Sequence, residues 1–535
     1  MSYKTNSAQQ LHIDDNINNL TKREQRILSK SWAKEFAERI FPMINENRFA
    51  VLYSGNDASR PNTPVNVIIG VLILKELFGM TDDEIMEELL FDVRYQYALH
   101  TTSFEEQPIS DRTLSRFRAR NYEHELKTGV DLIHETVTEL AAEMAALMKI
   151  NTRLQRMDSL MIAANIKKLS RLELLYTCVS NYVTYLHKTG CDEHLAGLEH
   201  YYDPTDYNRV IYHNRSTDTD DRVRQIITDA RGLIEKNGDV CGDVEEYRTL
   251  ARVMGEQTCT DENGALRLKT KHDGGMDSRM LQNPSDADAT YREKDGKQYR
   301  GYVANITEST NGRASIVTDY QYEQNTYSDS QFLTDAINVM GKQPATKTIV
   351  ADGAYDGAAN AKRAETNNIK IVTTNLAGRK ANDVHMDFKI DETVNSVTEC
   401  AAGVKPKTCN HNSKTGQYRV SFHRDNCVNC VYKDTCKPKI HKRTAVLTIS
   451  GKTPERARLQ QWMKTGDYQM FARFRNGIES VQSSLRRKYA VDGIPVRGKL
   501  RSKLFFGFKI AAVNFRKLVI YVNYLTRCNE SPVNG

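Results

Sequence analysis

The alternation of strand and helix signals between residues 298 and 373 constrains the fold of this chain more than any other feature. Short apolar, β-branched runs indicate strands, and stretches with helical periodicity lie between the later ones. Strands that alternate with helices imply a sheet covered on both faces, which makes the fold class α/β. We predict strands at 298–306, 314–318, 347–353 and 369–373, and helices at 328–340 and 356–366.

The first 125 residues carry the start and stop signals of several short helices. Gly79 ends one apolar helix, and Thr81 with Glu84 three residues later forms a capping box for the next. Ser110 caps a third helix, which is rich in arginine and carries Arg112, Arg116, Arg118 and Arg120. Short helices joined by tight turns, the last one rich in arginine, predict a helix-turn-helix-like DNA-binding unit. A plain helical bundle with a charged outer face fits the same pattern.

Three further segments show clear periodicity. A helix over 122–149 leads to a predicted strand at 153–162, and residues 167–262 show helical spacing again. For 500–524 we expect a long helix with its apolar side on the α/β domain and its cations toward DNA; a dimerisation helix is the alternative. This segment is too charged to span a membrane. The first residues lack the apolar core of a secretory signal, so we expect a cytoplasmic protein.

The charge of the chain is concentrated at one end. The whole sequence carries only +7, from 75 Lys and Arg against 68 Asp and Glu. From Lys437 to Gly535, 21 Lys and Arg stand against 5 Asp and Glu, a local charge of +16 that leaves −9 on the other 436 residues. A basic segment on an acidic remainder indicates a polyanionic partner, most often nucleic acid, although a solvated basic face has the same composition.

Three carboxylates are the candidates for chemistry. Asp158 lies within the first predicted strand, Asp352 ends a later one, and Glu479 lies on a predicted helix from Phe471 to Tyr489. Mg²⁺ prefers oxygen ligands, and two such ions about 3.5–4 Å apart can activate the attacking oxygen of a phosphoryl transfer and stabilise the leaving one. Taken singly, each acid has a plainer role at a strand edge, a turn or a helix surface. Their joint order favours a shared metal site.

The motifs around these acids resemble those of a known family, the DDE transposases of bacterial insertion sequences. The resemblance covers about residues 45 to 525. It rests on Met157-Asp158-Ser159 with Ala164-Asn165, on Val350 to Tyr355, on Phe474 to Glu479, and on Arg60-Pro61 through Arg118. It implies an RNase H-like mixed sheet flanked by helices, in which Asp158, Asp352 and Glu479 are the catalytic, metal-binding acids.

The resemblance also implies cofactors and partners. Two Mg²⁺ or Mn²⁺ ions would serve cleavage and strand transfer of double-stranded DNA, at the terminal inverted repeats of the element and at a target. A homodimer would hold the two ends together. The expected DNA-binding residues are Arg475, Arg486, Lys488, Arg112, Arg116 and Arg118. A catalytically silent DNA-binding regulator and an RNase H-type nuclease are the alternative functions.

The separations between the acids indicate two insertions, because 194 residues separate the two aspartates and 127 separate Asp352 from Glu479. We therefore predict six segments, each with its own character. They are a helical DNA-binding domain (1–125), a linker helix with the first catalytic strand (126–166), a helical insertion (167–270), the rest of the core (271–390), a Cys-rich insertion (391–445), and the Glu helix with basic C-terminal helices (446–535).

Half of the ten cysteines lie within 37 residues, at positions 400, 409, 427, 430 and 436. Cys427-x₂-Cys430 is a common zinc half-site, because two thiolates at that spacing reach one tetrahedral ion. Cys400 and Cys436 would complete four ligands, with Cys409 or His423 as substitutes. We expect a structural Zn²⁺ site; an iron–sulfur cluster or free reduced thiols are the alternatives.

Overall fold

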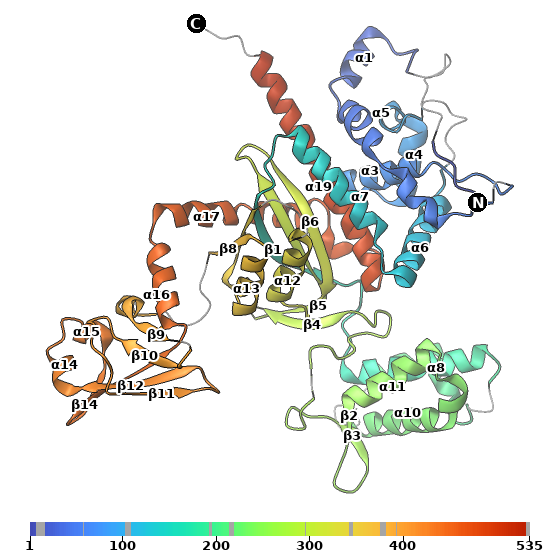
Figure 1. The fold of residues 1–535 in the computed structure, drawn as a ribbon. Coiled ribbons are helices and arrows are strands. Elements are labelled where there is room, and N and C mark those ends of the chain that lie inside the picture. The colour runs from blue at the N-terminus through green and yellow to red at the C-terminus, as the bar shows by residue number, and fades with distance from the viewer. Residues whose placement is uncertain are drawn as a thin grey trace. The chain divides into compact units, whose positions relative to one another are not determined.

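The computed structural model describes residues 1–6, 17–56, 58–101, 109–191, 195–212, 219–275, 277–294, 296–341, 346–374, 381–391 and 393–530. The chain forms two compact units. The first consists of Met1–Phe332 with Glu479–Gly535, and the second of Leu333–Ile478. Both combine helices with strands (Figure 1), so the mixed α/β class predicted from the sequence is confirmed.

The N-terminal part of the first unit is helical, and its helix ends follow local signals. Thr81 and Glu84 form the predicted capping box, and Gly79 ends the preceding helix with φ +70°. The single helix predicted over 122–149 is instead two helices, because Gly129 adopts φ +73° and ends the first. The helices are α1 (Lys22–Leu28), α2 (Trp32–Glu35), α3 (Val65–Phe78), α4 (Asp82–Phe91), α5 (Val93–Ala98), α6 (Asp111–Thr128) and α7 (Leu132–Leu147).

The sheet of the first unit is antiparallel. β1 pairs with β5 along one edge, and β4 and β6 pair with the other edge of β5. β6 is longer than predicted because alternating burial continues through Tyr320 and Tyr322. The strands are β1 (Leu154–Ala163), β4 (Thr290–Lys294), β5 (Lys297–Thr310) and β6 (Ser315–Gln324).

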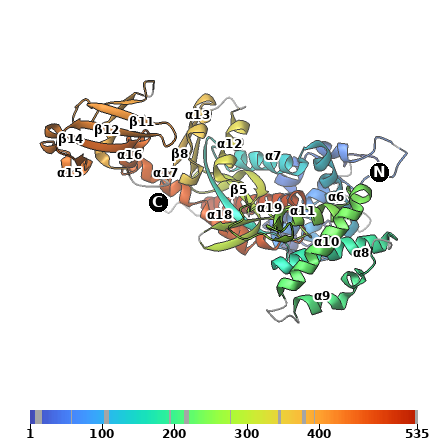
Figure 2. The same cartoon turned by 90° about the horizontal axis from the view of Figure 1, so that it is seen from below.

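The residues between β1 and β4 form a helical bundle with a core of its own. Leu175, Val179 and Tyr182 are fully buried on one helix, at the predicted helical spacing, and two further helices pack beside it (Figure 2). The elements are α8 (Arg171–Lys188), α9 (Pro204–Ile211), α10 (Thr219–Cys241), α11 (Glu245–Gln257), and the short strands β2 (Thr258–Thr260) and β3 (Leu266–Leu268).

The C-terminal helix α19 (Lys499–Glu530) is buried along more than half of its length. It contacts α3, α6, α7 and β6, and Figure 1 shows it in red beside α7. Phe506, Ile510 and Leu518 are completely buried on it. α19 therefore joins the N-terminal helices to the sheet. Across the described ranges, no helix is long and apolar enough to cross a membrane.

Three lysines of α19 are paired inside the first unit, so the expectation that this helix turns its cations toward DNA is wrong for them. Each one neutralises a carboxylate contributed by another element. The pairs are Lys503 with Asp131 (2.7 Å), Lys509 with Glu76 (2.5 Å) and Lys517 with Glu308 (2.5 Å). The +16 of the C-terminal segment is thus partly compensated within the fold.

Close packing around α19 predicts the effect of one small substitution. A Cβ on Gly507 would lie 2.4 Å from the hydroxyl oxygen of Tyr320 and 3.2 Å from Cγ2 of Ile133, and both side chains are buried. We expect Gly507→Ala to lower the free energy of unfolding of the first unit by about 1–3 kcal/mol through overpacking. Chemical denaturation measures the change. Gly232→Ala in α10, where nothing lies within 4 Å, is the control and should gain about 0.5–1 kcal/mol; equal behaviour of the two variants would contradict the packing.

The second unit contains a parallel pair of strands. β7 and β8 pair in register along five residues, and α13 connects them. Helix α12 contains the boundary between the two units. The strand predicted at 369–373 has these bounds, and both predicted helices are present. The elements are α12 (Asp329–Met340), β7 (Lys347–Ala351), α13 (Ala358–Thr366) and β8 (Ile369–Thr373).

A second, smaller sheet follows in the same unit, with the antiparallel strand order β11-β12-β14-β13. One face of β12 buries Tyr418, Val420 and Phe422, while the alternate residues face outward. The remaining elements of this unit are β9 (Lys389–Asp391), β10 (Ser396–Glu399), β11 (Thr408–Asn412), β12 (Gln417–His423), α14 (Arg424–Val428), α15 (Lys433–Cys436), β13 (Lys439–Ile440), β14 (Thr444–Ser450), α16 (Thr453–Trp462) and α17 (Gly466–Asn476).

Candidate active site

Asp158 lies in the middle of β1, where side chains alternate between the two faces of the strand. It shares its face with Leu160, which is buried in the same hydrophobic core as Val481 and Leu485 of α18 (Glu479–Arg487). Asp158 therefore lies on the face of β1 whose residue Leu160 belongs to that core.

Glu479 is the first residue of α18, not a residue in the middle of a helix. The single helix predicted from Phe471 to Tyr489 is divided into α17 and α18. Gly477, a poor helix former, lies at the break, and Ile478 beside it is fully buried. The carboxylate of Glu479 consequently stands at the positive end of a helix dipole, where negative charge is favoured.

Two hydrogen bonds fix how α18 lies along β1. Gln482 Nε2 donates to the carbonyl oxygen of Ser159 (3.3 Å), and Arg486 Nη2 donates to that of Met161 (2.8 Å). Four helical residues, a rise of about 6 Å, thus run beside two strand residues, about 6.6 Å. The helix and the strand therefore run in the same direction at this point.

The same register relates the two acids of the first unit. Glu479 precedes Gln482 by three residues, about 4.5 Å along the helix, and Asp158 precedes Ser159 by one residue, about 3.3 Å along the strand. The two acids are therefore level with each other along α18 and β1. The first unit thus holds two of the three predicted acids at a similar height along α18 and β1.

The third acid, Asp352, belongs to the second unit. It follows β7 and caps a short 3₁₀ helix, where its Oδ1 accepts a hydrogen bond from the N–H of Gly353 (2.6 Å). Its other oxygen, Oδ2, lies 3.9 Å from Nη2 of Arg475 on α17. The Asp352 side chain is 37% exposed and that of Arg475 is 12% exposed. A half-exposed carboxylate is thus held beside a nearly buried guanidinium.

Tyr468 is a neighbour of Asp352 that the sequence motifs do not single out. Its hydroxyl donates to the carbonyl oxygen of Thr374. Burial, and then the negative charge of Asp352, raises the pKa of Tyr468 above the ordinary range of tyrosine. Tyr468 precedes Arg475 by two helical turns on α17, so this i, i+7 spacing was the one available signal.

The arginines predicted to bind DNA on α6 divide into two groups. Arg112 and Arg116 are exposed. Arg118 instead binds both oxygens of Asp82 (2.6 and 2.8 Å) and lies 5.0 Å from the ring centre of Phe505. Burial raises the pKa of Asp82, but Arg118 outweighs it, so the pKa is lowered overall. Arg118 therefore links α6 to the start of α4 through Asp82.

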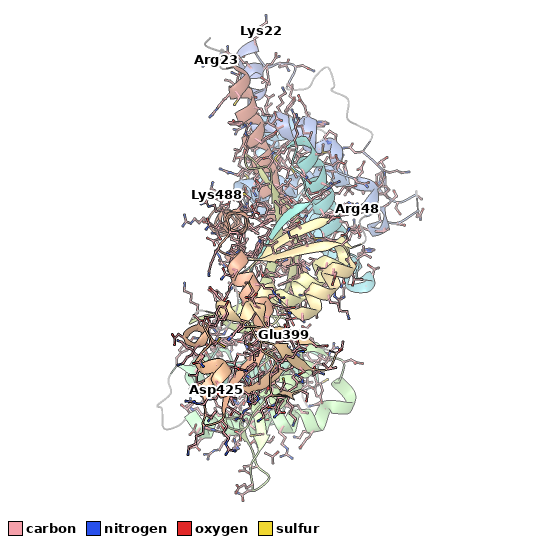
Figure 3. All side chains as sticks on the ribbon, turned by 60° about the vertical axis from the view of Figure 1, so that its left-hand side comes forward. Lys22, Arg23, Arg48, Glu399, Asp425 and Lys488 are labelled. Atoms are coloured by element: carbon pink, nitrogen blue, oxygen red, sulfur yellow. The ribbon has the colours of Figure 1, made fainter. Side chains whose placement is uncertain are left out.

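The cations that follow Glu479 divide in the same way. Arg486 forms an ion pair with Asp492 as well as its bond to Met161, so it anchors α18 to β1. Lys488, just beyond the helix, is exposed (Figure 3). Of the two, Lys488 is the more accessible to a phosphate.

The cysteines of the second unit lie around one small cavity. Cys400, Cys427, Cys430 and Cys436 line it, and Cys409 does not. Burial and the charges of neighbouring cysteines raise the pKa of Cys436 to about 12 and also raise that of Cys427. In the part of the chain that the structure describes, no three His, Cys, Asp or Glu side chains are placed to hold a metal ion as they stand.

Comparison with protein families gives two matches at separate parts of the chain. Residues 25–120 match a transposase domain (DUF772), and residues 399–519 match a transposase DDE domain. The first range contains α3 to the middle of α6, and the second contains the cysteines and Glu479. Both models are of transposases, which confirms the resemblance to DDE transposases of the insertion-sequence type. Asp158 and Asp352 lie outside both matched ranges.

Among solved structures, the chain matches the cryo-EM structure of a piggyBac transposase synaptic complex with hairpin DNA. The match has 9% sequence identity and covers 96% of this chain and 78% of that one, with a TM-score of 0.29. At this score we draw nothing from the likeness. No curated protein matches the chain.

Proposed function

We infer that this chain is the transposase of an insertion sequence, which cuts and joins DNA with Asp158, Asp352 and Glu479 as its metal-binding acids. The observation that carries the proposal is the register of α18 on β1, which makes Glu479 level with Asp158 in a chain that matches a transposase DDE domain. An RNase H-like core is part of the proposal. The antiparallel strands of the first unit and the parallel pair β7–β8 support it.

The three acids suit Mg²⁺ or Mn²⁺ by their chemistry. Carboxylate oxygens are the ligands these hard ions prefer, and Asp352 and Glu479 are both open enough to water to hold a hydrated ion. When two such ions are bound, they supply the positive charge that activates the attacking oxygen and stabilises the leaving one. The function of the acids would be to hold that charge in place, and Arg475 would orient Asp352.

DNA recognition would use the exposed cations. We assign contacts with phosphates to Lys488, and contacts of the N-terminal helices to Arg112 and Arg116. Arg486 and Arg118 would act indirectly, by positioning α18 and α6. The substrates would be the terminal inverted repeats of the element and a target duplex in a bacterial cytoplasm, with a homodimer pairing the two ends.

The test is a reaction with linear DNA that carries candidate element ends, with and without Mg²⁺. A transposase should nick the DNA at the ends and join the freed 3′ ends to target DNA, and EDTA should stop both steps. Binding without cleavage at any Mg²⁺ or Mn²⁺ concentration would instead indicate a silent regulator. Cleavage without joined products would indicate a nuclease. Either result would overturn the proposal.

A further inference from the structure

The small sheet of the second unit encloses a cavity of about 30 Å³ whose lining is mostly apolar except for thiols. Four cysteines reach it from three separate segments of the chain. They are Cys400 after β10, Cys427 and Cys430 around the end of α14, and Cys436 at the end of α15. It is unusual for an otherwise apolar cavity of this size to be lined by four thiols from separate segments.

The backbone holds these cysteines in tight turns. Around Cys400, the N–H of Gly403 donates to the Cys400 carbonyl (2.8 Å), and Gly403 has φ +72°. At the Cys427-x₂-Cys430 turn, the N–H of Tyr432 donates to Sγ of Cys430 (3.4 Å). This hydrogen bond fixes the position of the Cys430 sulfur at the turn.

The structure separates this set from the other candidate ligands. Sγ of Cys409 accepts a hydrogen bond from the N–H of Val397 (3.4 Å), and Cys409 is paired with Val420 in the sheet. Neither Cys409 nor His423 lines the cavity. We propose that Cys400, Cys427, Cys430 and Cys436 bind one structural Zn²⁺ ion. This site goes beyond the proposed DNA chemistry and does not depend on it.

The spacing of the thiols favours a single ion. Cys427-x₂-Cys430 is a common half-site for one tetrahedral Zn²⁺, and the cavity of about 30 Å³ has room for one small ion. Tetrahedral zinc needs its sulfurs at about 2.3 Å. The four side chains must therefore turn inward when the ion binds. Each thiol then loses its proton, and the resulting four-thiolate zinc centre carries −2, which Lys433 at the cavity partly offsets.

The local fold explains why an ion would be needed. The helices α14 and α15, which contain Cys427 and Cys436, have only five and four residues and are too short to be stable without tertiary support. The apolar core of this small sheet consists of few residues, namely Phe388, Val397, Tyr418, Val420, Phe422, Leu447 and Ile449. Small cores of this kind are commonly completed by a metal. Zinc would fasten α14 and α15 to the turn after β10.

The direct test is the metal content of the full chain, purified under reducing conditions. We expect one zinc and no iron per chain by mass spectrometry of the elements. Exchange with Co²⁺ should give the strong near-ultraviolet charge-transfer absorption of thiolate–cobalt bonds. Cys427→Ser and Cys436→Ser should lose the bound zinc, whereas the matched control Cys409→Ser should keep it.

Several results would overturn the site. These are a zinc-free protein that also takes up no Zn²⁺ or Co²⁺ on titration, iron in place of zinc, or loss of zinc from Cys409→Ser. If the serine variants fail to fold, the site can be tested on the wild-type protein with a thiol reagent. A thiol reagent should release one zinc per chain and speed hydrogen exchange in residues 396–450, and no release would contradict the proposal. Metal content is measured without DNA. The zinc site can therefore be disproved while the transposase proposal holds, and the transposase proposal can be disproved while the zinc site holds.

Discussion

Asp352→Asn is expected to abolish Mg²⁺-dependent cleavage of element-end DNA and to leave binding to those ends nearly unchanged. The amide keeps the size of the carboxyl group and can still accept the hydrogen bond from Gly353. It lacks the negative charge that a hard cation requires. Removing one preorganised electrostatic group from an active site costs about 10²–10³ in kcat, and a metal ligand should cost no less. Rates of nicking and gel-shift affinities measure the two effects separately.

Asp356→Asn is the matched control for this variant. Asp356 lies four residues further along in the same unit, and its side chain is exposed. It should cleave DNA at the wild-type rate. Asp158→Asn and Glu479→Gln should behave like Asp352→Asn. If Asp352→Asn cleaves within tenfold of the wild type, Asp352 is not a metal ligand, whatever the other two acids do.

Glu308→Ala should cause the largest loss of stability among single substitutions in the first unit. Glu308 of β5 is 0% exposed and binds both Arg156 of β1 (2.6 Å) and Lys517 of α19 (2.5 Å). Its removal leaves two cations in the interior without their counter-charge, a situation that costs about 3–5 kcal/mol. Chemical denaturation measures the change in the free energy of unfolding. Hydrogen exchange of the β1 and β5 amides shows whether the loss is located at this pair of strands. Glu235→Ala, which breaks the exposed pair with Arg231, should cost less than about 1 kcal/mol.

The same buried carboxylate gives the stability a predictable dependence on pH. Burial raises the pKa of Glu308, but Lys517 and Arg156 outweigh it, so the pKa lies below the ordinary range of glutamate. A carboxyl group whose pKa is lowered by folding contributes stability above its unfolded pKa. That contribution is lost as the pH falls below about 4.5 toward the folded pKa. On acidification through this pH range, the free energy of unfolding should fall less in Glu308→Ala than in the wild type. If it falls equally in both, Glu308 is not the source of the pH dependence.

Features set by neighbouring residues could be predicted from the sequence. The capping box of Thr81 and Glu84, the strand at 369–373 and the placement of Asp158 on a strand all depend on short patterns. Asp352 lies just beyond β7 instead of on the predicted strand 347–353, because the strand ends at Ala351. The break at Gly477 was not predicted, because the apolar stripe of α18 continues the spacing of α17 across it. A pattern of this kind records which face is buried, but not whether the backbone bends.

Features set by distant partners could not be predicted. Arg118 and Lys509 look like DNA-binding cations in sequence, because nothing near them along the chain announces Asp82 or Glu76. A lysine on an apolar helix can be buried when a carboxylate pairs with it in the interior. The tertiary fold decides which carboxylate that is. The same limit applied to the cysteines, where spacing alone left Cys409 and His423 as possible substitutes.

The burial of α19 has a consequence for how the protein is made. Glu76 on α3 and its partner Lys509 are separated by 433 residues, and α3 is buried on nearly every side. A ribosome releases α3 long before α19, so the face of α3 that packs against α19 stays uncovered until synthesis is nearly complete. During that interval the nascent chain needs shielding by chaperones. Messages cut short before α19 would yield chains that quality control can distinguish from complete ones by this exposed surface.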